Sequence, residues 1–424
     1  MLKDCRDYQS VKDTLQSLPE TLDDTYSRIL RNLPKPHVRN AKRLLQFLAF
    51  SERPLRIEEA VDVLAVDSTA KPRFDEKDRM PEPEEIAEYC ASLVIVTGKP
   101  ANREIQLVHF SVQTYLVSDN VQQTFAEDLR EPTARAAVAE TCLAYLLELD
   151  DSQPIKLLCS LRPFAKYAAR YWAGNAARGS EGSVHRLAME LFTNQHKYRI
   201  WWLLYASHEP RTKYEWDEEP STLYYASLIG FKSCVKEILR EGVKVNAQGG
   251  PYGSALQAAS ERGHINIVRL LLEHEADVNA QGGYSGSALQ AASAGGHIDI
   301  VRLLLEYEAD VNAQGGPYGS ALQAASEKGY IDIVRLLLEH EADVNAQGGR
   351  SGSALQAASE NGHLDIVRLL LEHEANVNAQ GGRSGSALQA ASEGGHLDIV
   401  RLLQEQEEEE EKVEEEEADG RRVP

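Results

Sequence analysis

A block of sequence that returns at a fixed interval constrains the fold of this chain more than any other feature. The block begins at Ser254, and each later copy starts 33 residues after the one before, at Ser287, Ser320, Ser353 and Ser386. A fixed period of this length is typical of solenoids, whose short repeats bury their apolar faces only by packing against their neighbours. We therefore expect residues 221–403 to form one rod of stacked repeats.

Each repeat is expected to contain two short helices followed by a turn-rich segment. Ser254 and Gln257 match a capping box, in which the serine accepts a backbone N–H and the glutamine reaches back to the cap. Gly263 can adopt the positive φ that ends this helix. The second helix has an apolar stripe made by Ile267, Val268, Leu271 and Leu272. The remainder is rich in Asp, Asn and Gly, and should project as a hairpin finger.

The repeats resemble the ankyrin repeat. The resemblance lies in Gly263-His264, in the Ile-Val-x-Leu-Leu-Leu helix, and in the run from Ala276 to Ala280. It extends from Ser221 to roughly Leu403, as five clear repeats and a divergent first one. Membership of that family implies an α-solenoid with hairpin fingers, and a concave groove that binds protein partners.

The repeats differ from one another mainly at the tips of the fingers and at the ends of the first helices, which line the groove in the ankyrin family. Tyrosine and arginine, the usual anchors of protein interfaces, recur there. We therefore predict a partner-binding surface formed by Tyr252, Tyr284, Tyr318, Arg350, Arg383, Arg262, Lys328 and Asn361.

One departure from the ankyrin pattern concerns the end of the second helix. The family has a glycine there, which the first repeat keeps as Gly242, whereas the later repeats have Glu275, Glu308, Glu341 and Glu374. A non-glycine residue in the left-handed conformation costs on the order of 1 kcal/mol. We therefore predict that Glu341→Gly raises the melting temperature.

Composition restricts the class of protein and its environment. The net charge is −21, of which residues 404–419 contribute −10 (ten Glu, one Asp and one Lys), so the rest of the chain carries −11. Broad attraction to nucleic acid or to an anionic membrane is not expected. The five scattered cysteines favour a reducing compartment, and no apolar run is long enough for a membrane span. We expect a soluble cytoplasmic protein whose residues 404–424 form an acidic disordered tail.

The N-terminal 120 residues have the element order of a winged helix preceded by a helical segment. Apolar spacing predicts helices over 11–32, broken at Pro19, and over 38–50 and 57–64, and a polar loop then leads to a further stretch over 86–93. Residues 93–97 and 105–110 are two apolar runs joined by Gly98-Lys99-Pro100, which indicates a hairpin.

This part resembles the winged-helix segment that follows the NTPase core in fungal NACHT-type, NLR-like receptors. The phrases SLPETLDDTYSRIL, LLQFLAFSERPLRIEEAVDVLAV and LVHFSVQTYLVS carry the resemblance. In that family the core binds ATP or ADP, and the winged helix acts as a lid, whose histidine corresponds to His109. The chain contains no Gly-x-x-x-x-Gly-Lys-Ser/Thr loop, so we expect no cofactor, and we favour His109 as a half-buried hairpin residue bonded to a backbone carbonyl.

Winged helices often bind DNA, but the helix over 57–64 argues against that function here. Its polar side carries Glu58, Glu59 and Asp62, with only Arg56 beside it. Carboxylates in a groove lined by phosphates are repelled. We therefore expect no nucleic-acid partner.

Residues 121–220 are predicted to form a helical spacer rich in aromatic residues. All four tryptophans lie there: Trp172, Trp201, Trp202 and Trp216. Helices are expected over 137–149, 161–172 and 184–206, with an exposed loop over 174–183. The aromatic rings could form a ligand cage, although large rings more often form a core.

The sequence offers little for catalysis or metal binding. No Gly-x-Ser-x-Gly elbow or His-Glu-x-x-His pair is present, and the histidines that recur with the repeat are expected to be structural. The leading hypothesis is therefore a non-enzymatic recognition module, the sensing end of an NLR-like receptor that lacks its NTPase core and oligomerises only as part of a full receptor. A free-standing ankyrin scaffold, and an enzyme with an unrecognised site in residues 126–216, remain as alternatives.

Overall fold

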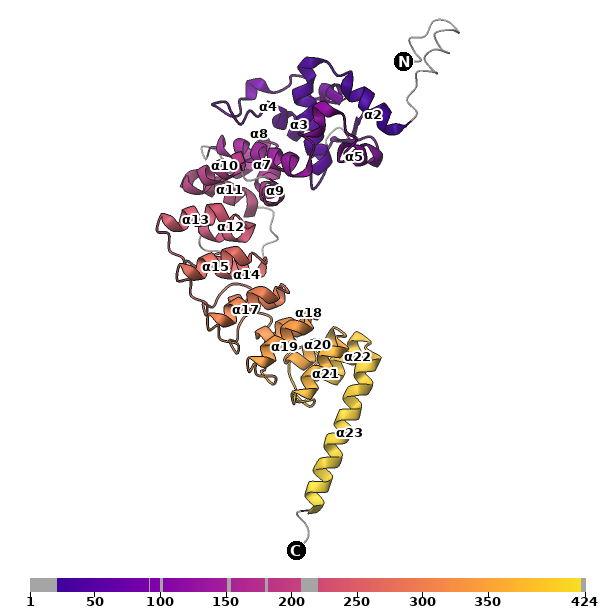
Figure 1. Cartoon of the computed structure of the whole chain (residues 1–424), viewed down its shortest axis with the longest axis vertical. Helices are drawn as coiled ribbons and strands as arrows, with labels where there is room; N and C mark the ends of the chain where they lie inside the picture. The colour runs from indigo at the N-terminus through magenta and orange to yellow at the C-terminus, as the bar shows by residue number, and fades with distance from the viewer. Residues whose placement is uncertain are drawn as a thin grey trace. The chain divides into compact units, whose positions relative to one another are not determined.

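The computed structural model describes residues 21–90, 92–99, 102–150, 154–179, 182–206 and 220–420. The chain divides into two compact units, Met1–Lys213 and Tyr214–Pro424, which are called here the N-terminal and the C-terminal unit (Figure 1). Each is described by itself. The helix predicted over residues 11–18 and the side chain of Trp216 lie outside the described residues.

The N-terminal unit begins with a winged helix. Its helices are α2 (Leu22–Arg31), α3 (Val38–Phe50), α4 (Ile57–Ala65) and α5 (Phe110–Leu116), with shorter turns η2 (Lys35–His37), η3 (Glu76–Asp78), η4 (Pro83–Cys90) and α6 (Gln123–Ala126). Strands β1 (Leu55–Arg56), β2 (Val94–Thr97) and β3 (Glu104–Leu107) form an antiparallel sheet in the order β1-β3-β2. Ile105 sits at its centre, opposite Leu55 on one side and Val96 on the other.

Three details of this winged helix differ from the prediction. The stretch over 86–93, to which the sequence assigned no helix or strand, overlaps a 3₁₀ helix that ends at Cys90. The second strand of the predicted hairpin ends at Leu107, and Phe110 opens helix α5 instead of ending a strand. Strand β1 was not predicted, because two residues are too few to show the alternation that identifies a strand.

Two of the three acidic side chains of α4, Glu59 and Asp62, are buried in ion pairs, whereas Glu58 is exposed. Glu59 has no exposed side-chain surface and accepts two hydrogen bonds from the Arg53 guanidinium, at 2.8 and 2.7 Å. Asp62 is 1% exposed and accepts from Arg79 at 2.7 Å and from the Tyr145 hydroxyl at 2.5 Å. These two carboxylates therefore stabilise the packing of α4. The charge argument against DNA binding assumed that both lie on an exposed face, and that assumption was wrong for Glu59 and for Asp62.

The remainder of the N-terminal unit is helical. Its helices are α7 (Glu131–Leu147), α8 (Ile155–Leu161), α9 (Ala165–Arg178), α10 (Gly182–Thr193) and α11 (Gln195–Ala206). The helix predicted over 161–172 is interrupted at Arg162, which precedes Pro163 and is not helical, with φ −124° and ψ 73°. The loop predicted over 174–183 was wrong, since α9 continues to Arg178 and α10 begins at Gly182.

The aromatic side chains of these helices form a core. Trp172 and Trp201 are 0% and 2% exposed, with ring centroids 6.2 Å apart. Phe164 lies 5.8 Å from Phe47 of α3, so the winged helix and the following helices share buried packing. The rings fill the interior themselves, which favours the core over the ligand cage.

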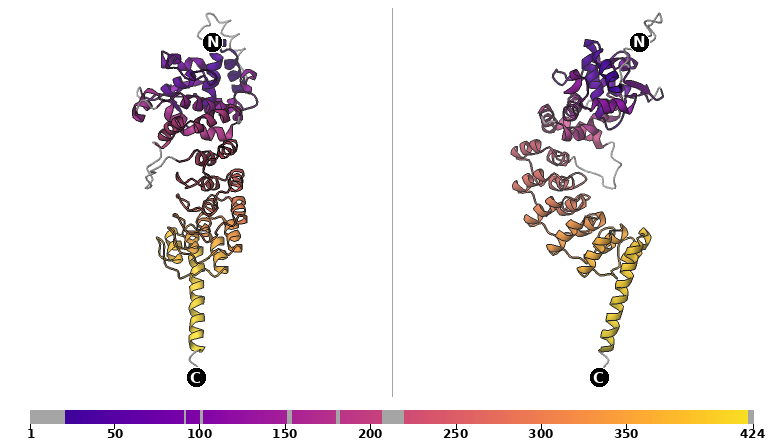
Figure 2. Two further views of the ribbon diagram at one scale, coloured as in Figure 1. Left: turned by 90° about the vertical axis from the view of Figure 1, so that its left-hand side faces the viewer. Right: turned by 45° about the vertical axis from the view of Figure 1, so that its right-hand side comes forward.

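The C-terminal unit is a stack of six helix pairs, each joined to the next by a hairpin finger (Figure 2). The first helices are α12 (Thr222–Ile229), α14 (Ala255–Glu261), α16 (Ala288–Ala294), α18 (Ala321–Lys328), α20 (Ala354–Glu360) and α22 (Ala387–Gly394). The second helices are α13 (Lys232–Arg240), α15 (Ile265–Glu273), α17 (Ile298–Glu306), α19 (Ile331–Glu339), α21 (Leu364–Glu372) and α23 (Leu397–Gly420). The apolar stripe predicted in the second helices is buried between neighbours, so the chain is an α-solenoid preceded by a winged helix.

The helix ends follow the predicted chemistry. All five capping boxes are present; in the first of them the Gln257 backbone N–H donates to the Ser254 hydroxyl and the Gln257 side chain accepts from the Ser254 N–H. The first five second helices are followed by a left-handed residue, which is Gly242 in the first repeat and glutamate in the other four, with φ between 61° and 64° at the glutamates. The strain expected at these glutamates is therefore present.

The last helix, α23, differs from the prediction. Residues 404–420 are helical and continue α23, whereas the sequence had suggested a disordered tail. Ile399 and Leu403 are buried and fix the first turns, and glutamate extends an established helix at little cost. Although α23 is long, no helix among the described residues is both long and apolar enough to cross a lipid bilayer.

Candidate partner-binding groove

The fingers are tight hairpins that pack directly on one another. In the finger after α15, the Gly282 N–H donates to the Gly286 carbonyl at 2.9 Å, and later fingers repeat this pairing. Gly283 has a φ of +62°, and a Cβ atom there would lie 2.1 Å from the carbonyl carbon of Tyr252 in the preceding finger. Only glycine permits this close approach.

The capping glutamines hold each finger in place. Besides its role in the cap, the Gln257 side-chain amide donates to the carbonyls of Ala280, Gly282 and Gly286, at 3.4, 3.0 and 2.5 Å. The same three bonds are made by Gln290, Gln323 and Gln356. Sequence reasoning predicted the cap and missed this second role. The signal for it was the same glutamine in each of the five clear repeats, next to the apolar residues of the first helix, since a polar side chain there needs several hydrogen-bond partners.

The tips of the fingers are also joined by backbone hydrogen bonds. The Tyr284 N–H donates to the Pro251 carbonyl at 2.7 Å, and the Arg350 N–H donates to the Pro317 carbonyl at 2.8 Å. The Arg383 N–H donates to the Arg350 carbonyl at 3.1 Å. The tips are thus held by backbone atoms, which leaves their side chains free to vary.

Six of the eight predicted partner-binding residues form aromatic or cation–π contacts along the groove. Arg262 lies over the ring of Tyr252 at 5.8 Å, and Lys328 lies over the ring of Tyr318 at 5.2 Å. Tyr284 contacts Tyr318 edge to face at 6.0 Å and carries Arg350 on its ring at 5.6 Å. We call these six residues, Tyr252, Arg262, Tyr284, Tyr318, Lys328 and Arg350, the groove cluster.

The other two predicted residues lie outside the groove cluster. Arg383 occupies the next finger tip, where its side chain is exposed. Asn361 is exposed and donates its side-chain amide to the Ala357 carbonyl at 2.9 Å, so it caps the end of its own helix. Asn361 therefore has a structural role that the sequence did not reveal.

Glutamates form a lower layer beneath the finger tips. Glu261 accepts from the buried Ser285 hydroxyl at 3.0 Å, and burial raises the pKa of this carboxyl. In later repeats the serine at the tip bonds to the glutamate at the end of its own first helix, as in Ser351 to Glu360 at 3.2 Å. Each tip is therefore matched to a helix end: a tyrosine pairs with a cation, and a serine pairs with a glutamate. Sequence reasoning missed this matching.

The recurring histidines connect neighbouring repeats. The His297 Nε2 lies 3.0 Å from the Glu261 carbonyl, and His264, His363 and His396 make the equivalent contact to the repeat before them. Burial of the His264 ring is the main reason why the pKa of this histidine is lowered. The third position of the series is occupied by Tyr330 instead.

His109 is placed differently from the expectation. It is exposed and forms the N-cap of α5, where its Nδ1 accepts the Ser111 backbone N–H at 3.2 Å and lies 2.7 Å from the Ser111 hydroxyl. The prediction of a half-buried ring bonded to a backbone carbonyl was therefore wrong. A histidine followed two residues later by serine, at the start of an apolar helix, was the signal for a cap.

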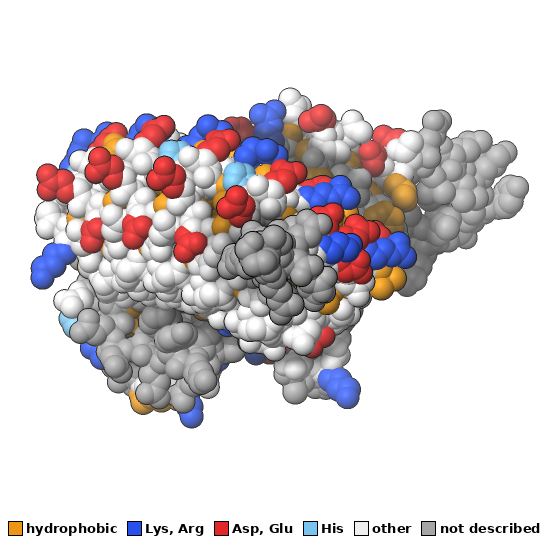
Figure 3. All heavy atoms as spheres, turned by 90° about the horizontal axis from the view of Figure 1, so that it is seen from below, with side chains coloured by type: hydrophobic (Ala, Val, Ile, Leu, Met, Phe, Trp, Pro, Cys, Tyr) orange, Lys and Arg blue, Asp and Glu red, His pale blue; other side chains and the backbone are white. Residues whose placement is uncertain are grey.

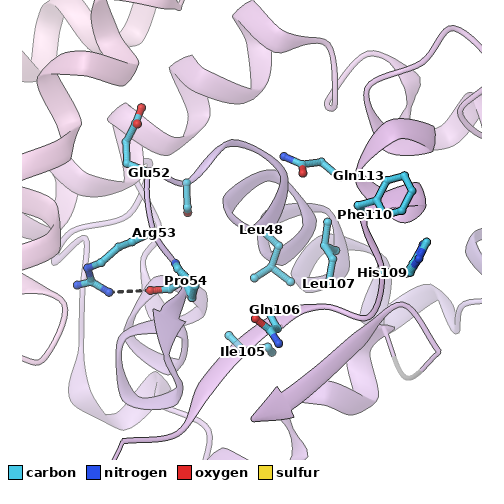
Figure 4. Close-up of a pocket in the computed structure, with 11 residues that line it drawn as sticks. Leu48, Glu52, Arg53, Pro54, Ile105, Gln106, Leu107, His109, Phe110 and Gln113 are labelled. Carbon is cyan, nitrogen blue, oxygen red and sulfur yellow. Dashed lines mark hydrogen bonds between the residues drawn. The ribbon is translucent and has the colours of Figure 1, made fainter. Parts of the chain in front are cut away.

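Near His109 the winged helix has a cavity of about 310 Å³, which Phe110 and Gln113 also line (Figure 4). Its polar groups are largely engaged within the fold. Gln113 donates to the Ala49 carbonyl at 2.8 Å, and Arg53 is held by Glu59. The Ser51 hydroxyl, which also lines the cavity, is buried without a hydrogen-bond partner among the described residues. Since two of the larger polar side chains are already engaged, we take the groove of the C-terminal unit as the stronger candidate site.

Comparison with known proteins agrees with this architecture. Residues 186–282, 280–348 and 345–414 match a model of ankyrin repeats, and residues 34–128 match the GPI inositol-deacylase winged helix domain. The first ankyrin match begins ahead of Ser221, where the sequence reasoning placed the first repeat. The chain is also similar to azaphilone pigments biosynthesis cluster protein L of Monascus ruber, with 36% identity over 275 residues, which is 59% of this chain and 58% of that protein.

Proposed function

Because the chain belongs to the ankyrin-repeat family, and its repeats follow a winged helix of the GPI inositol-deacylase type, we propose that it is a non-enzymatic module that binds a protein partner in the groove. The observation that supports this function most directly is that the repeats differ from one another mainly at the finger tips. The framework residues recur in nearly every repeat, whereas the finger tips change from Pro-Tyr to Tyr-Ser to Arg-Ser. A surface that varies on a constant framework is suited to recognition.

The finer proposal is that the module is the sensing and regulatory end of an NLR-like signalling receptor. The order of winged helix, helical segment and ankyrin repeats supports it. In this arrangement partner binding at the groove is passed to an NTPase core. A phosphate loop encoded in frame upstream of Met1, in the same transcript, would support the receptor, and its absence would favour a free-standing scaffold.

Groove binding can be tested with two matched variants of the whole chain. The groove variant carries Tyr252→Ala, Tyr318→Ala, Arg350→Ala and Arg383→Ala. The control variant carries Tyr307→Ala, Tyr330→Ala, Arg302→Ala and Arg335→Ala, which are exposed residues of the second helices and their ends and give the same change in charge and aromatic content. Circular dichroism establishes that both variants fold.

Partners captured by the wild type are identified by mass spectrometry, purified, and measured against all three proteins by calorimetry. We expect the groove variant to bind at least roughly tenfold more weakly, since anchor residues commonly contribute more than 1 kcal/mol each. The control should bind like the wild type. Equal affinity of the groove variant and the wild type would refute the proposal.

A further inference from the structure

The exposed layer of the groove is cationic. Arg262, Lys328, Arg350 and Arg383 are exposed, whereas Glu261, Glu327 and Glu360 are only partly exposed, and Glu393 at the last helix end is the exposed exception. Among the described side chains of the repeats, Lys328 pairs with Glu327 at 3.0 Å, and no carboxylate oxygen lies within 4.0 Å of the Arg262, Arg350 or Arg383 guanidinium. A ligand entering the groove therefore meets arginines that have no ion-pair partner within the fold.

The glutamates beneath them are already engaged. Glu261 and Glu360 each accept a serine hydroxyl from a finger tip, and Glu393 accepts from Ser384 at 2.8 Å. These carboxylates therefore compete poorly with a ligand for the arginine N–H groups.

The tyrosines orient two of these arginines. The guanidinium carbon of Arg262 lies 5.8 Å from the centre of the Tyr252 ring, and that of Arg350 lies 5.6 Å from the centre of the Tyr284 ring. A cation–π contact leaves the guanidinium N–H groups able to donate hydrogen bonds to another partner. A guanidinium edge has the geometry to bind a carboxylate through two parallel hydrogen bonds. Holding the side chain against a ring also reduces the entropy lost on binding.

We propose that the groove cluster recognises an acidic segment of its protein partner, with Asp or Glu carboxylates on the edges of Arg262 and Arg350 and apolar side chains against Tyr284 and Tyr318. This inference rests on the proposed function, because it specifies the partner of the same groove. Elsewhere the repeats are strongly acidic: Asp277, Asp310 and Asp343 are exposed, and Figure 3 shows acidic side chains at regular intervals on one face of the molecule. The net charge of −21 repels an acidic partner at long range, so recognition depends on contacts inside the groove.

Selection from a library tests the chemistry without assuming a partner. A phage-displayed library of short random peptides is selected on the whole chain, with counter-selection on the Arg262→Gln/Arg350→Gln variant. We expect the retained peptides to be enriched in Asp and Glu relative to the starting library. Enrichment of basic or purely apolar peptides, or no enrichment, would overturn the proposal.

Affinity measurements then locate the interaction. The best selected peptide, labelled with fluorescein, is titrated by fluorescence polarisation with the wild type, with Arg262→Gln/Arg350→Gln, and with the matched control Arg269→Gln/Arg335→Gln on the second helices. We expect a loss of at least roughly tenfold for the groove variant only, because charge-assisted hydrogen bonds are lost there. Arg262→Lys/Arg350→Lys should bind with intermediate affinity, since lysine keeps the charge but lacks the paired N–H geometry. Equal losses in groove and control variants would show a general charge effect and overturn the proposal.

The two proposals fail separately. If a captured partner binds through the groove but changing its Asp and Glu residues to Asn and Gln leaves its affinity unchanged, the acidic segment is wrong and groove recognition stands. If no captured partner binds the groove variant more weakly than the wild type, the proposed function itself is refuted.

Discussion

The glutamates that end four of the second helices offer a direct test of how backbone conformation limits the stability of the rod. Glu341 has a φ of +64°, and its N–H donates to the Leu338 carbonyl at 3.0 Å. The next N–H, of Ala342, donates to the Leu337 carbonyl at 3.0 Å. This pair of bonds is the Schellman motif, in which the left-handed residue is usually glycine. Replacing Glu341 with glycine should keep the motif and remove its strain.

The expected magnitude follows from three contributions. Glycine adopts the left-handed conformation without strain, so the substitution should raise the free energy of unfolding by about 1–2 kcal/mol from this cause. Removing a carboxylate from the negative end of a helix gains about 0.3–1 kcal/mol, and the greater freedom of glycine in the unfolded chain loses about 0.4–1 kcal/mol. The sum is a stabilisation of about 1 kcal/mol, which for a unit of this size raises the melting temperature by about 2–4 °C.

The position of the tryptophans makes the assay specific. All four precede the first predicted repeat, so their fluorescence reports mainly on residues outside the stacked repeats, whereas far-UV circular dichroism includes the helices of the rod. We expect Glu341→Gly to move the dichroism transition to higher temperature or urea concentration and to leave the fluorescence transition in place.

Two further variants separate backbone strain from charge. Glu341→Gln removes the charge and keeps the strain, so it should gain only a few tenths of a kcal/mol. Gly242→Glu introduces the strain in the first repeat, where a Cβ atom meets nothing within 4 Å, and should lose about 1 kcal/mol. If Glu341→Gln were as stabilising as Glu341→Gly, or if glycine lowered the transition, the explanation by left-handed strain would be refuted.

Three other predictions concern the bonds between repeats. Gln323→Ala removes a capping bond and three bonds to the next finger, so it should destabilise the rod by about 2–4 kcal/mol. Gln389 makes the capping bond but has no finger after it among the described residues, so Gln389→Ala should destabilise the rod by only about 1 kcal/mol. Urea unfolding of both variants measures the difference. Tyr330→His should restore the interrupted series by bonding to the Ala294 carbonyl and gain about 1 kcal/mol, and an unchanged urea midpoint would contradict this. The lowered pKa of His264 means that its contribution to stability is complete above the ordinary pKa of 6.5 and is lost as the pH falls through the lower folded value. His264→Gln should therefore lose less stability than the wild type between about pH 7 and pH 5, and parallel losses measured by urea unfolding would exclude this role.

The repeats could be predicted well because each signal occurs five times. A capping serine, a turn glycine and an apolar stripe at one position are weak evidence alone, but their recurrence fixes the register and the element boundaries. The left-handed glutamates were predicted for the same reason, since the register identified the residue at which each helix had to turn.

Contacts that join distant residues could not be predicted in this way. The pairing of Leu55 with Ile105 depends on the fold of the whole winged helix, and so do the burial of Glu59 and Asp62. Their charges suggested an exposed face because a carboxylate is rarely buried without partners, and the partners, Arg53 and Arg79, are known only from the structure. The loop over 174–183 failed because its glycines and serines suggested a longer break than the short one between α9 and α10.

The way the fingers are held explains how this groove can acquire specificity without loss of stability. The bonds that position each finger come from the capping glutamine and from backbone atoms, so the side chains at the tips are not needed to hold the hairpin.

A change such as Tyr to Ser at a tip does require a suitable neighbour at the end of a first helix. Tyr252 and Tyr318 make cation–π contacts with Arg262 and Lys328, respectively, whereas the Ser351 hydroxyl donates a hydrogen bond to Glu360. Where the helix of a repeat ends in Ala294-Gly295 and offers no such neighbour, Ser285 bonds instead to Glu261 of the repeat before it. Specificity in this rod is therefore set by pairs of residues, a tip and a helix end, and a transplanted tip should retain its binding contribution only when its paired helix end is transplanted with it.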